Sequence, residues 1–291
     1  MIGQNEEQVI RMTILITGAQ GQLGKQLVKK LSPSHKIVGL RRNELDITQK
    51  DEVERIIYRV KPDLIIHAAA YTAVDQCENE QKKAFEVNGL GAGYVAQAAA
   101  RIEARMFYIS SDYVFDGKNM KPYNEDDGPN PLSVYGMSKW LGEELVKQLN
   151  NGTIIRTSWL YGHDGKNFVK TMLDLGKRKK EIKVVNDQIG SPTYVNDLVD
   201  TIIPLLNKKN GIYHVSNTGS CSWYDFAKAI FQEAGFNQEL IQPITTKEYG
   251  AAALRPSYSV LGQNSLAEEN IKSPRHWREA LNEFIRKEIH E

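Results

Sequence analysis

Residues 13–31 join a short apolar strand, a glycine-rich turn and a helix, and this order restricts the fold more than any other feature of the chain. TILIT (13–17) is a buried-strand pattern, GAQGQLG (18–24) is the turn, and QLVKKL (26–31) is helical. Glycines permit a tight turn with close backbone approach, and the first N–H groups of the helix are free to bind a phosphate. This context is that of a dinucleotide site. We expect these residues to contact the dinucleotide: Gly18, Gln20, Gly21, Gln22 and Leu23.

The end of the second strand, KIVGL (36–40), bears on the choice of dinucleotide because Arg41 and Arg42 follow it. An acidic residue at this strand end binds the ribose 2′-hydroxyl of NAD, whereas arginine accommodates the 2′-phosphate of NADP. The pair therefore favours NADPH. NADH stays an alternative, because two solvated arginines would give the same pattern. In the LDIT segment that follows, Asp46 and Ile47 are expected at the adenine edge, although Asp46 could instead cap the next helix.

The third strand, LIIH (64–67), runs into a row of small residues. Alanine at these positions would let a cofactor lie close over the strand end, so we expect Ala68, Ala69 and Ala70 to contact it. His67 has no metal-ligating residues beside it in the sequence and is interpreted as a structural histidine.

The stretch from Ser110 to Lys139 carries the residues with the clearest chemistry. Tyr135 and Lys139 lie four residues apart at the head of a helical segment, which places a phenol and an ammonium on one helix face. A neighbouring cation favours phenolate and lowers the pKa of a phenol, as a general acid requires. Ser111, at the end of an apolar strand, could offer a second hydroxyl to the same reacting oxygen. The alternative is an ordinary surface Tyr–Lys pair.

The alternation of strands and helices over the first half of the chain predicts an α/β fold with a doubly wound parallel sheet, Rossmann-like, and a smaller α/β substrate-binding domain. Met12 starts the first strand, so residues 1–11 are expected to be a leader outside the fold. The expected NADP-binding domain spans residues 12–162, and the chain returns to it around 194–217. Residues 163–193 and 218–291 would form most of the substrate-binding domain.

Composition and charge exclude several classes of function. The net charge of +1 gives no basis for binding nucleic acid or a membrane surface. No apolar run is long enough for a membrane span, and the N-terminus is too polar for a signal peptide. The two cysteines, Cys77 and Cys221, have neither metal-site spacing nor a disulfide framework, so a cytoplasmic protein without a metal site is expected.

Nine fragments, spread over nearly the whole chain after Met12, together resemble the extended short-chain dehydrogenase/reductase family. They are ITGAQGQLG (16–24), LDIT (45–48), HAAAYTAVDQCE (67–78), VNG (87–89), SSDYVFDG (110–117), PLSVYGMSK (131–139), RTSWLYG (156–162), QIGSPTY (188–194) and RPSYSVL (255–261). The resemblance implies NADPH-dependent reduction of the C4 keto group of dTDP-4-dehydro-L-rhamnose (dTDP-6-deoxy-4-keto-L-mannose) to dTDP-L-rhamnose. Tyr135 would donate a proton to the C4 oxygen, and Lys139 would bind the nicotinamide ribose. Ser111 matches a position that is usually threonine and keeps the hydroxyl.

The resemblance also suggests how the sugar nucleotide is bound. Asp112 is followed by Tyr113, where related dehydratases place a second acid, so a dehydratase is not expected. Trp159 would stack on the sugar ring, or else fill core space. Arg255 would contact the diphosphate of the substrate, or else stabilise the fold. The loop that contains Gln188 and Gly190 to Thr193 borders the substrate in this family, so these residues are expected to line the same pocket.

Two other functions remain open at this point. One is a non-catalytic NADP-binding regulatory subunit of the same fold, and the other is a reductase or epimerase acting on another nucleotide sugar. Some members of the family form a homodimer through a magnesium site. The residues identify no ligand set for Mg2+ here, so both the homodimer and the ion are left as alternatives.

Overall fold

The structure, a computed structural model, describes residues 11–178 and 180–290. The leader predicted for residues 1–11 therefore lies outside the described residues, apart from Arg11, which is exposed. Within the described ranges, no helix combines the length and the apolar character that crossing a membrane requires.

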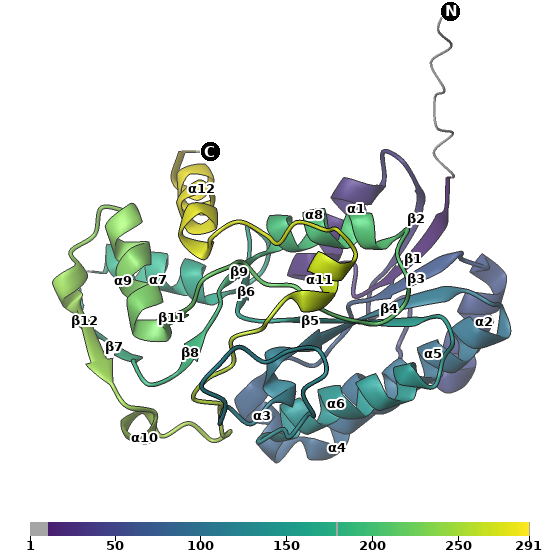
Figure 1. Cartoon of the computed structure of the whole chain (residues 1–291), viewed down its shortest axis with the longest axis horizontal. Coiled ribbons are helices and arrows are strands. Elements are labelled where there is room, and N and C mark those ends of the chain that lie inside the picture. Colours follow the sequence, from purple (N-terminus) through teal and green to yellow (C-terminus); the bar gives the residue numbers. More distant parts are fainter. Residues whose placement is uncertain (1–10, 179, 291) are drawn as a thin grey trace, which may run out of the picture.

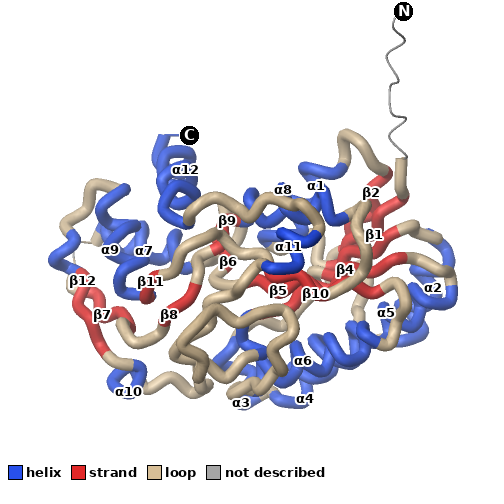
Figure 2. The backbone as a smooth tube through the Cα atoms, viewed as in Figure 1, coloured by secondary structure: helices blue, strands red, loops and turns tan. Residues whose placement is uncertain are grey.

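A six-stranded sheet, parallel throughout, forms the centre of the larger part of the molecule (Figures 1 and 2). The strand order is β10-β5-β4-β3-β1-β2, so successive connections run in opposite directions from β1. The strands are β1 (Thr13–Thr17), β2 (Lys36–Leu40), β3 (Leu64–His67), β4 (Arg105–Ser111), β5 (Gly152–Thr157) and β10 (Ile212–His214). The predicted doubly wound parallel sheet is confirmed.

Helices cover both faces of this sheet (Figure 1). On one face, α1 (Gln22–Leu31) packs against α8 (Val195–Leu205), and on the other α5 (Gly91–Arg101) packs between α2 (Lys50–Val60) and α6 (Val134–Lys147). Each face buries its own apolar cluster, because the strands are apolar on both sides. Between β3 and α5 the chain forms α3 (Val74–Asn79), α4 (Gln81–Ala84) and a π-helical turn, η1 (Phe85–Leu90). A short 3-10 turn, η2 (Asp112–Val114), follows β4.

The smaller part of the molecule combines short strand pairs with helices (Figure 2). Its parallel pairs are β6 (Leu160–Tyr161) with β9 (Thr193–Tyr194) and β7 (Ile182–Val185) with β12 (Ile241–Ile244); β8 (Ile189–Gly190) and β11 (Cys221–Ser222) are antiparallel. Its helices are α7 (Phe168–Lys177), α9 (Trp223–Glu233), the 3-10 turn η3 (Gln238–Leu240), α10 (Thr246–Tyr249) and α12 (Trp277–His290). Helix α11 (Asn264–Glu268) packs instead against β10 of the large sheet. Helices α7 and α9 pack together over the strands.

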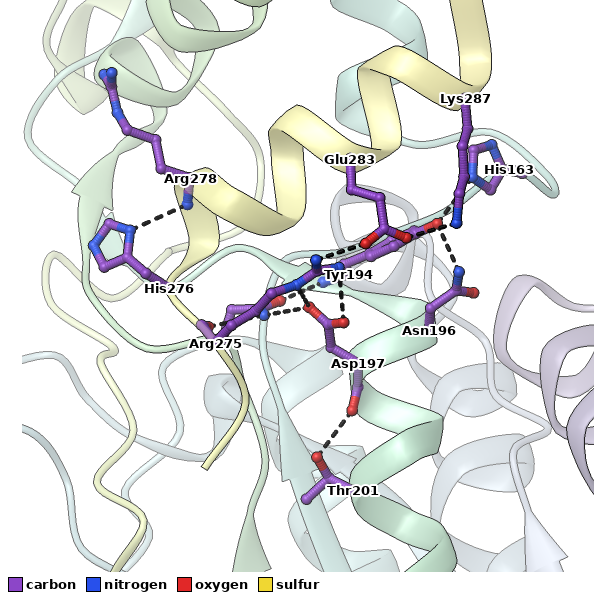
Figure 3. Close-up of polar contacts among 11 residues, drawn as sticks. His163, Tyr194, Asn196, Asp197, Thr201, Arg275, His276, Arg278, Glu283 and Lys287 are labelled. Carbon is purple, nitrogen blue, oxygen red and sulfur yellow. Dashed lines mark hydrogen bonds and ion pairs between the residues drawn. The ribbon is translucent and has the colours of Figure 1, made fainter. Parts of the chain in front are cut away.

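The C-terminal helix α12 is attached to the rest of the fold by a polar network (Figure 3). Arg275 donates to both carboxylate oxygens of Asp197 in α8, each at 3.0 Å, and to Glu283 of α12 at 2.6 Å. His163, which follows β6, lies 2.9 Å from the Tyr194 hydroxyl of β9. The network therefore joins α12 to the segment that leads the chain back to the central sheet.

Candidate active site

Two adjoining cavities open at the carboxyl ends of β1, β3 and β4, where parallel α/β sheets bind their ligands. We call the larger one, of about 530 Å³, the central cavity, and the smaller one, of about 280 Å³, the outer cavity. They lie where the chain connections leave β1 in opposite directions. Four residues line both cavities: Gly18, Gly21, Ala68 and Ala70.

The structure brings almost all of the predicted site residues to these two cavities. The central cavity is lined by Gly18, Gly21, Gln22, Leu23, Ala68, Ala70, Ser111, Asp112, Tyr113, Tyr135, Lys139 and Trp159. The outer cavity is lined by Gly18, Gln20, Gly21, Arg41, Arg42, Asp46, Ile47, Ala68, Ala69 and Ala70. Arg255 lines neither of them.

The glycine-rich turn is shaped for close approach to the neighbouring strand end. Gly18 has a φ of +68°, and a Cβ there would lie 2.8 Å from the backbone of Ala69. Both observations require glycine. Gly21 then caps α1, whose first turn holds no acidic side chain. The free N–H groups of this helix end can therefore bind an anionic group without competition.

Ser111, Tyr135 and Lys139 come from two elements that meet at the central cavity. Ser111 ends β4, where its hydroxyl accepts the backbone N–H of Tyr113 at 3.2 Å and donates to Asp112 at 3.1 Å. Helix α6 starts at Val134, capped by Ser133, and carries Tyr135 and Lys139 one turn apart. The ammonium of Lys139 donates to the Ile109 carbonyl at 2.7 Å, which draws α6 against the end of β4.

The electrostatics of this pair correct one expectation drawn from the sequence. Burial raises the pKa of the Tyr135 phenol, and a hydrogen bond with Ser111 opposes this rise only in part. Lys139 is not among the groups that lower it. Burial also lowers the pKa of Lys139 to about 7, against the carboxylate of Glu143, which raises it. Desolvation thus outweighs the Tyr–Lys attraction that the spacing suggested.

Asp112 and Tyr113, which directly follow Ser111, also line the central cavity. Asp112 is buried, and burial raises its pKa to about 6, although hydrogen bonds from Ser259 and Ser111 act in the opposite direction. Tyr113 packs edge-on against Tyr135, with ring centroids 5.6 Å apart. These two residues therefore offer the cavity one carboxyl group with a pKa of about 6 and one phenol.

Trp159 forms a wall of the cavity together with a residue that the sequence did not point to. Its indole stacks on Trp223 of α9, with centroids 3.6 Å apart and planes 9° apart. A Cβ on Gly190 would lie 2.6 Å from the Trp159 ring, so the 188–193 loop supports this wall from behind. Residues 188–193 do not themselves line the cavity, contrary to the expectation for this loop.

The structure places Arg255 in an ion pair with Asp75. The guanidinium donates to the two carboxylate oxygens at 3.0 and 2.7 Å. Asp75 lies in α3, and Arg255 lies in the loop between α10 and α11, so the pair joins two distant segments of the chain. The predicted contact with a diphosphate stays a prediction.

His67 and Asp46 differ in how well their polar atoms are satisfied. His67 is buried, and its Nδ1 lies 2.9 Å from the Thr17 hydroxyl, but Nε2 has no partner among the described residues. Burial lowers its pKa to about 3, so the ring is neutral. Asp46 accepts the backbone N–H of Thr48 at 3.0 Å and its hydroxyl at 2.7 Å. Helix α2 is capped at Gln49 without a side-chain hydrogen bond, so the alternative that Asp46 caps this helix is wrong; its bonds to Thr48 form a turn before the helix, beside the outer cavity.

Several cavity residues were missed because they are brought in by tertiary packing. They are Thr157, Ser158, Leu160, Lys166 and Trp223 in the central cavity and Lys83 in the outer one. Thr157 pairs in register with Ser111 at the end of the neighbouring strand β5. The end of that strand is the one sequence feature that could have predicted a further residue of the cavity. Across residues 11–178 and 180–290, no group of three or more His, Cys, Asp or Glu residues could hold a metal ion.

The parallel sheet, the glycine turn and the Tyr135–Lys139 pair at the strand ends define a protein of the extended short-chain dehydrogenase/reductase class. Comparison with known proteins narrows this class. The sequence model of the family described as RmlD substrate binding domain matches residues 12–289, and the chain belongs to that family.

Relatives and solved structures agree with this assignment. The chain is 48% identical to spore coat polysaccharide biosynthesis protein SpsK of Bacillus subtilis, covering 94% of this chain and 96% of the relative. It is 45% identical to dTDP-4-dehydrorhamnose reductase of Aggregatibacter actinomycetemcomitans, over 92% and 96% of the two chains. The crystal structure of dTDP-4-dehydrorhamnose reductase from Bacillus anthracis in complex with NADP superposes with a TM-score of 0.92 at 47% identity, covering 96% of this chain and all of that one.

Proposed function

We propose that this chain is an NADPH-dependent reductase that converts the C4 keto group of dTDP-4-dehydro-L-rhamnose into the hydroxyl of dTDP-L-rhamnose. The observation that carries the proposal is the convergence of Ser111, Tyr135 and Lys139 on the central cavity, beside the Gly18 turn. A proton donor, a second hydroxyl and a cation next to a dinucleotide cradle are the groups that reduction of a ketone requires. The names of the relatives support the dTDP-linked 4-keto sugar as substrate.

The residues present fit a nicotinamide dinucleotide phosphate. The Gly18 turn leaves no room for a side chain against Ala69, and this is the close approach that a pyrophosphate requires. Arg41 and Arg42 at the outer cavity suit the 2′-phosphate. When bound, NADPH supplies the hydride; NADH remains the alternative that the same cradle could accept.

The residues of the central cavity would manage the proton. The Tyr135 phenol is protonated at neutral pH, and burial raises its pKa further. It therefore holds the proton that the C4 oxygen needs. Giving it up creates a buried phenolate, and the Lys139 ammonium one helical turn away would stabilise that charge. The Ser111 hydroxyl would bind the same oxygen and so orient the ketone.

The remaining site residues would bind the sugar nucleotide. Asp112, Tyr113 and Trp159 line the central cavity, and Trp159 would contact the sugar ring beside its stacking on Trp223. Arg255 would act on the diphosphate only if its pairing with Asp75 gives way or is shared. We infer that residues 12–162 with the return at 194–217 form the NADP-binding domain, and that 163–193 and 218–291 form most of the substrate-binding domain.

Location and assembly complete the proposal. Both cysteines, Cys77 and Cys221, are buried and free, which is consistent with the reducing cytoplasm that we infer. The homodimer and any Mg2+ at its interface stay predictions.

The test is NADPH oxidation with dTDP-4-dehydro-L-rhamnose formed in situ from the upstream sugar nucleotide. We expect turnover that requires the sugar nucleotide and is lost in Tyr135→Phe. Tyr58→Phe, which removes a phenol near the end of α2 that lines neither cavity, is the matched control and should retain turnover. If the wild-type protein binds NADPH tightly without turning over, the reductase assignment is wrong and the regulatory-subunit alternative replaces it. Turnover only with a different dTDP-4-keto sugar would correct the substrate and keep the reaction.

A further inference from the structure

A buried carboxylate lies directly behind the catalytic pair. Helix α6 presents Tyr135, Lys139 and Glu143 at intervals of four residues, so the three side chains share one face. Glu143 is fully buried and lines neither cavity. The proposed reaction uses Tyr135 and Lys139 but gives no role to Glu143.

Glu143 and Lys139 hold adjacent residues of β4. The Lys139 ammonium donates to the Ile109 carbonyl at 2.7 Å, and the Ser110 hydroxyl donates to the Glu143 carboxylate at 2.5 Å. The next residue of the strand is Ser111, which lines the central cavity together with Tyr135. Two consecutive residues at the end of β4, Ile109 and Ser110, are therefore each bound to a side chain of α6.

Arg156 fixes the carboxylate of Glu143 from the neighbouring strand, β5. Its guanidinium donates to the two oxygens at 2.9 and 2.7 Å, and both side chains are almost completely buried. Its remaining nitrogen lies 3.2 Å from Nε2 of His214 in β10, which can accept because Nδ1 faces the Gly262 carbonyl at 3.0 Å. Burial and the charge of Arg156 lower the pKa of His214 to about 3, so this ring is neutral.

The groups that face Lys139 come from three elements. His67 of β3 is neutral, because burial lowers its pKa to about 3. The Tyr108 ring of β4 lies 4.1 Å from the ammonium, and burial raises the pKa of its phenol, as it does for Tyr135 of α6. Among the described residues that face this ammonium, Glu143 is the one that brings negative charge.

We propose that Glu143 is a positioning residue for the reduction: held by Arg156, it fixes the end of β4 through Ser110 and keeps the Lys139 ammonium charged. This inference rests on the proposed function, because that reaction requires a cation beside Tyr135. Without the carboxylate, a desolvated ammonium loses the nearby charge that offsets its burial. The positive charge of Arg156 would then also be uncompensated, and it would oppose protonation of Lys139.

The experiment is a titration of the Lys139 side chain by NMR of isotope-labelled lysine, with its signal assigned by its loss in Lys139→Arg. Three variants are compared with the wild-type protein. Glu143→Gln removes the carboxylate and leaves the Arg156 charge. The double variant Glu143→Gln with Arg156→Met removes both charges. Ser110→Ala breaks the contact to β4 but leaves both charges in place, so it is the matched control.

The expected midpoints differ in order and size. Glu143→Gln should lower the midpoint of Lys139 by about one pH unit or more, which is the size of shift that a single nearby charge produces. The double variant should titrate between Glu143→Gln and the wild type, and Ser110→Ala should titrate with the wild type. The alkaline limb of kcat/KM should move to lower pH in the same order.

The result that overturns the inference is a Lys139 midpoint that does not change in folded Glu143→Gln. If Glu143→Gln fails to fold, the test uses the double variant Glu143→Gln with Arg156→Met, which also lacks the carboxylate. Its Lys139 midpoint should still lie below that of the wild type. A midpoint equal to that of the wild type would refute the role of Glu143. The titration needs no substrate. Shifted midpoints without turnover in the wild type would therefore contradict the proposed reaction alone, whereas turnover with unshifted midpoints would contradict the role of Glu143 alone.

Discussion

Arg42 offers the sharpest test of cofactor choice, because the two arginines after β2 differ in their surroundings. Both line the outer cavity. The Arg41 guanidinium lies 3.9 Å from the Glu44 carboxylate, whereas Arg42 has no ion pair within the part of the chain that the structure describes. The charge of Arg42 helps to lower the pKa of Asp46, but no ion pair fixes its guanidinium, so Arg42 is the better placed of the two to bind a phosphate. We therefore expect Arg42→Ala to weaken NADPH binding more than Arg41→Ala does.

The expected loss of NADPH affinity in Arg42→Ala can be estimated from the exposure of this side chain. A hydrogen bond to a charged group contributes about 1.5–3 kcal/mol, and Arg42 is exposed, which favours the lower end. At about 1.4 kcal/mol per factor of ten, Arg42→Ala should raise the Kd for NADPH roughly 10- to 30-fold. NADH lacks the 2′-phosphate, so its Kd should change by less than about twofold on the same reasoning.

The assay is titration of each dinucleotide at two salt concentrations, since an exposed ion pair weakens as salt rises. Arg59→Ala on α2, an exposed arginine that lines neither cavity, is the matched control and should leave both constants unchanged. Equal losses of NADPH and NADH affinity in Arg42→Ala would refute the phosphate role of this residue.

Three further predictions follow from the site and the core. Tyr135→Phe should lower kcat by about 10²- to 10⁴-fold while the Kd for NADPH stays nearly unchanged, as stopped-flow and binding assays would check; normal turnover would exclude it as the proton donor. Gly190→Ala would place a methyl group 2.6 Å from the Trp159 indole, so we expect altered tryptophan fluorescence and a raised KM for the sugar nucleotide with NADPH affinity retained. His67 and His214 must each stay neutral, with pKa values lowered from 6.5 to about 3. The unfolded chain therefore binds more protons below pH 6.5, and the free energy of unfolding should fall by about 1.4 kcal/mol per pH unit for each histidine as the pH drops, a slope that His214→Gln should reduce in denaturant titrations.

The parts of the fold with a strong local signal could be predicted from the sequence. Residues 13–31 show their strand, turn and helix directly, because apolar runs and glycines determine those elements over short distances. The neighbours of each strand depend instead on contacts between distant segments. The pairing of β10 with β5 is such a case, since residues 212–214 carry no local mark of the strand that they join.

The candidate site, like the fold, could be predicted only where the signal is local in the sequence. The spacing of Tyr135 and Lys139 predicted their shared helix face, but not that burial would dominate both pKa values, because desolvation depends on everything packed around a group. Trp223 could not be connected with Trp159, since their stacking depends on how α9 packs. Glu143 reads locally as an ordinary helix residue, and its ion pair with Arg156 appears only once β5 lies beside α6.

The position of β10 at the edge of the large sheet has a consequence for synthesis on the ribosome. A nascent chain that has emerged only as far as β5 leaves the backbone edge of that strand open, and Arg156 lacks His214. Exposed strand edges pair with other chains, so such an intermediate is a site of aggregation. The cofactor-binding half therefore cannot complete its folding until residues 212–214 have left the exit tunnel. Truncation after residue 162 should yield an aggregating fragment, although most strands of the sheet are present in it.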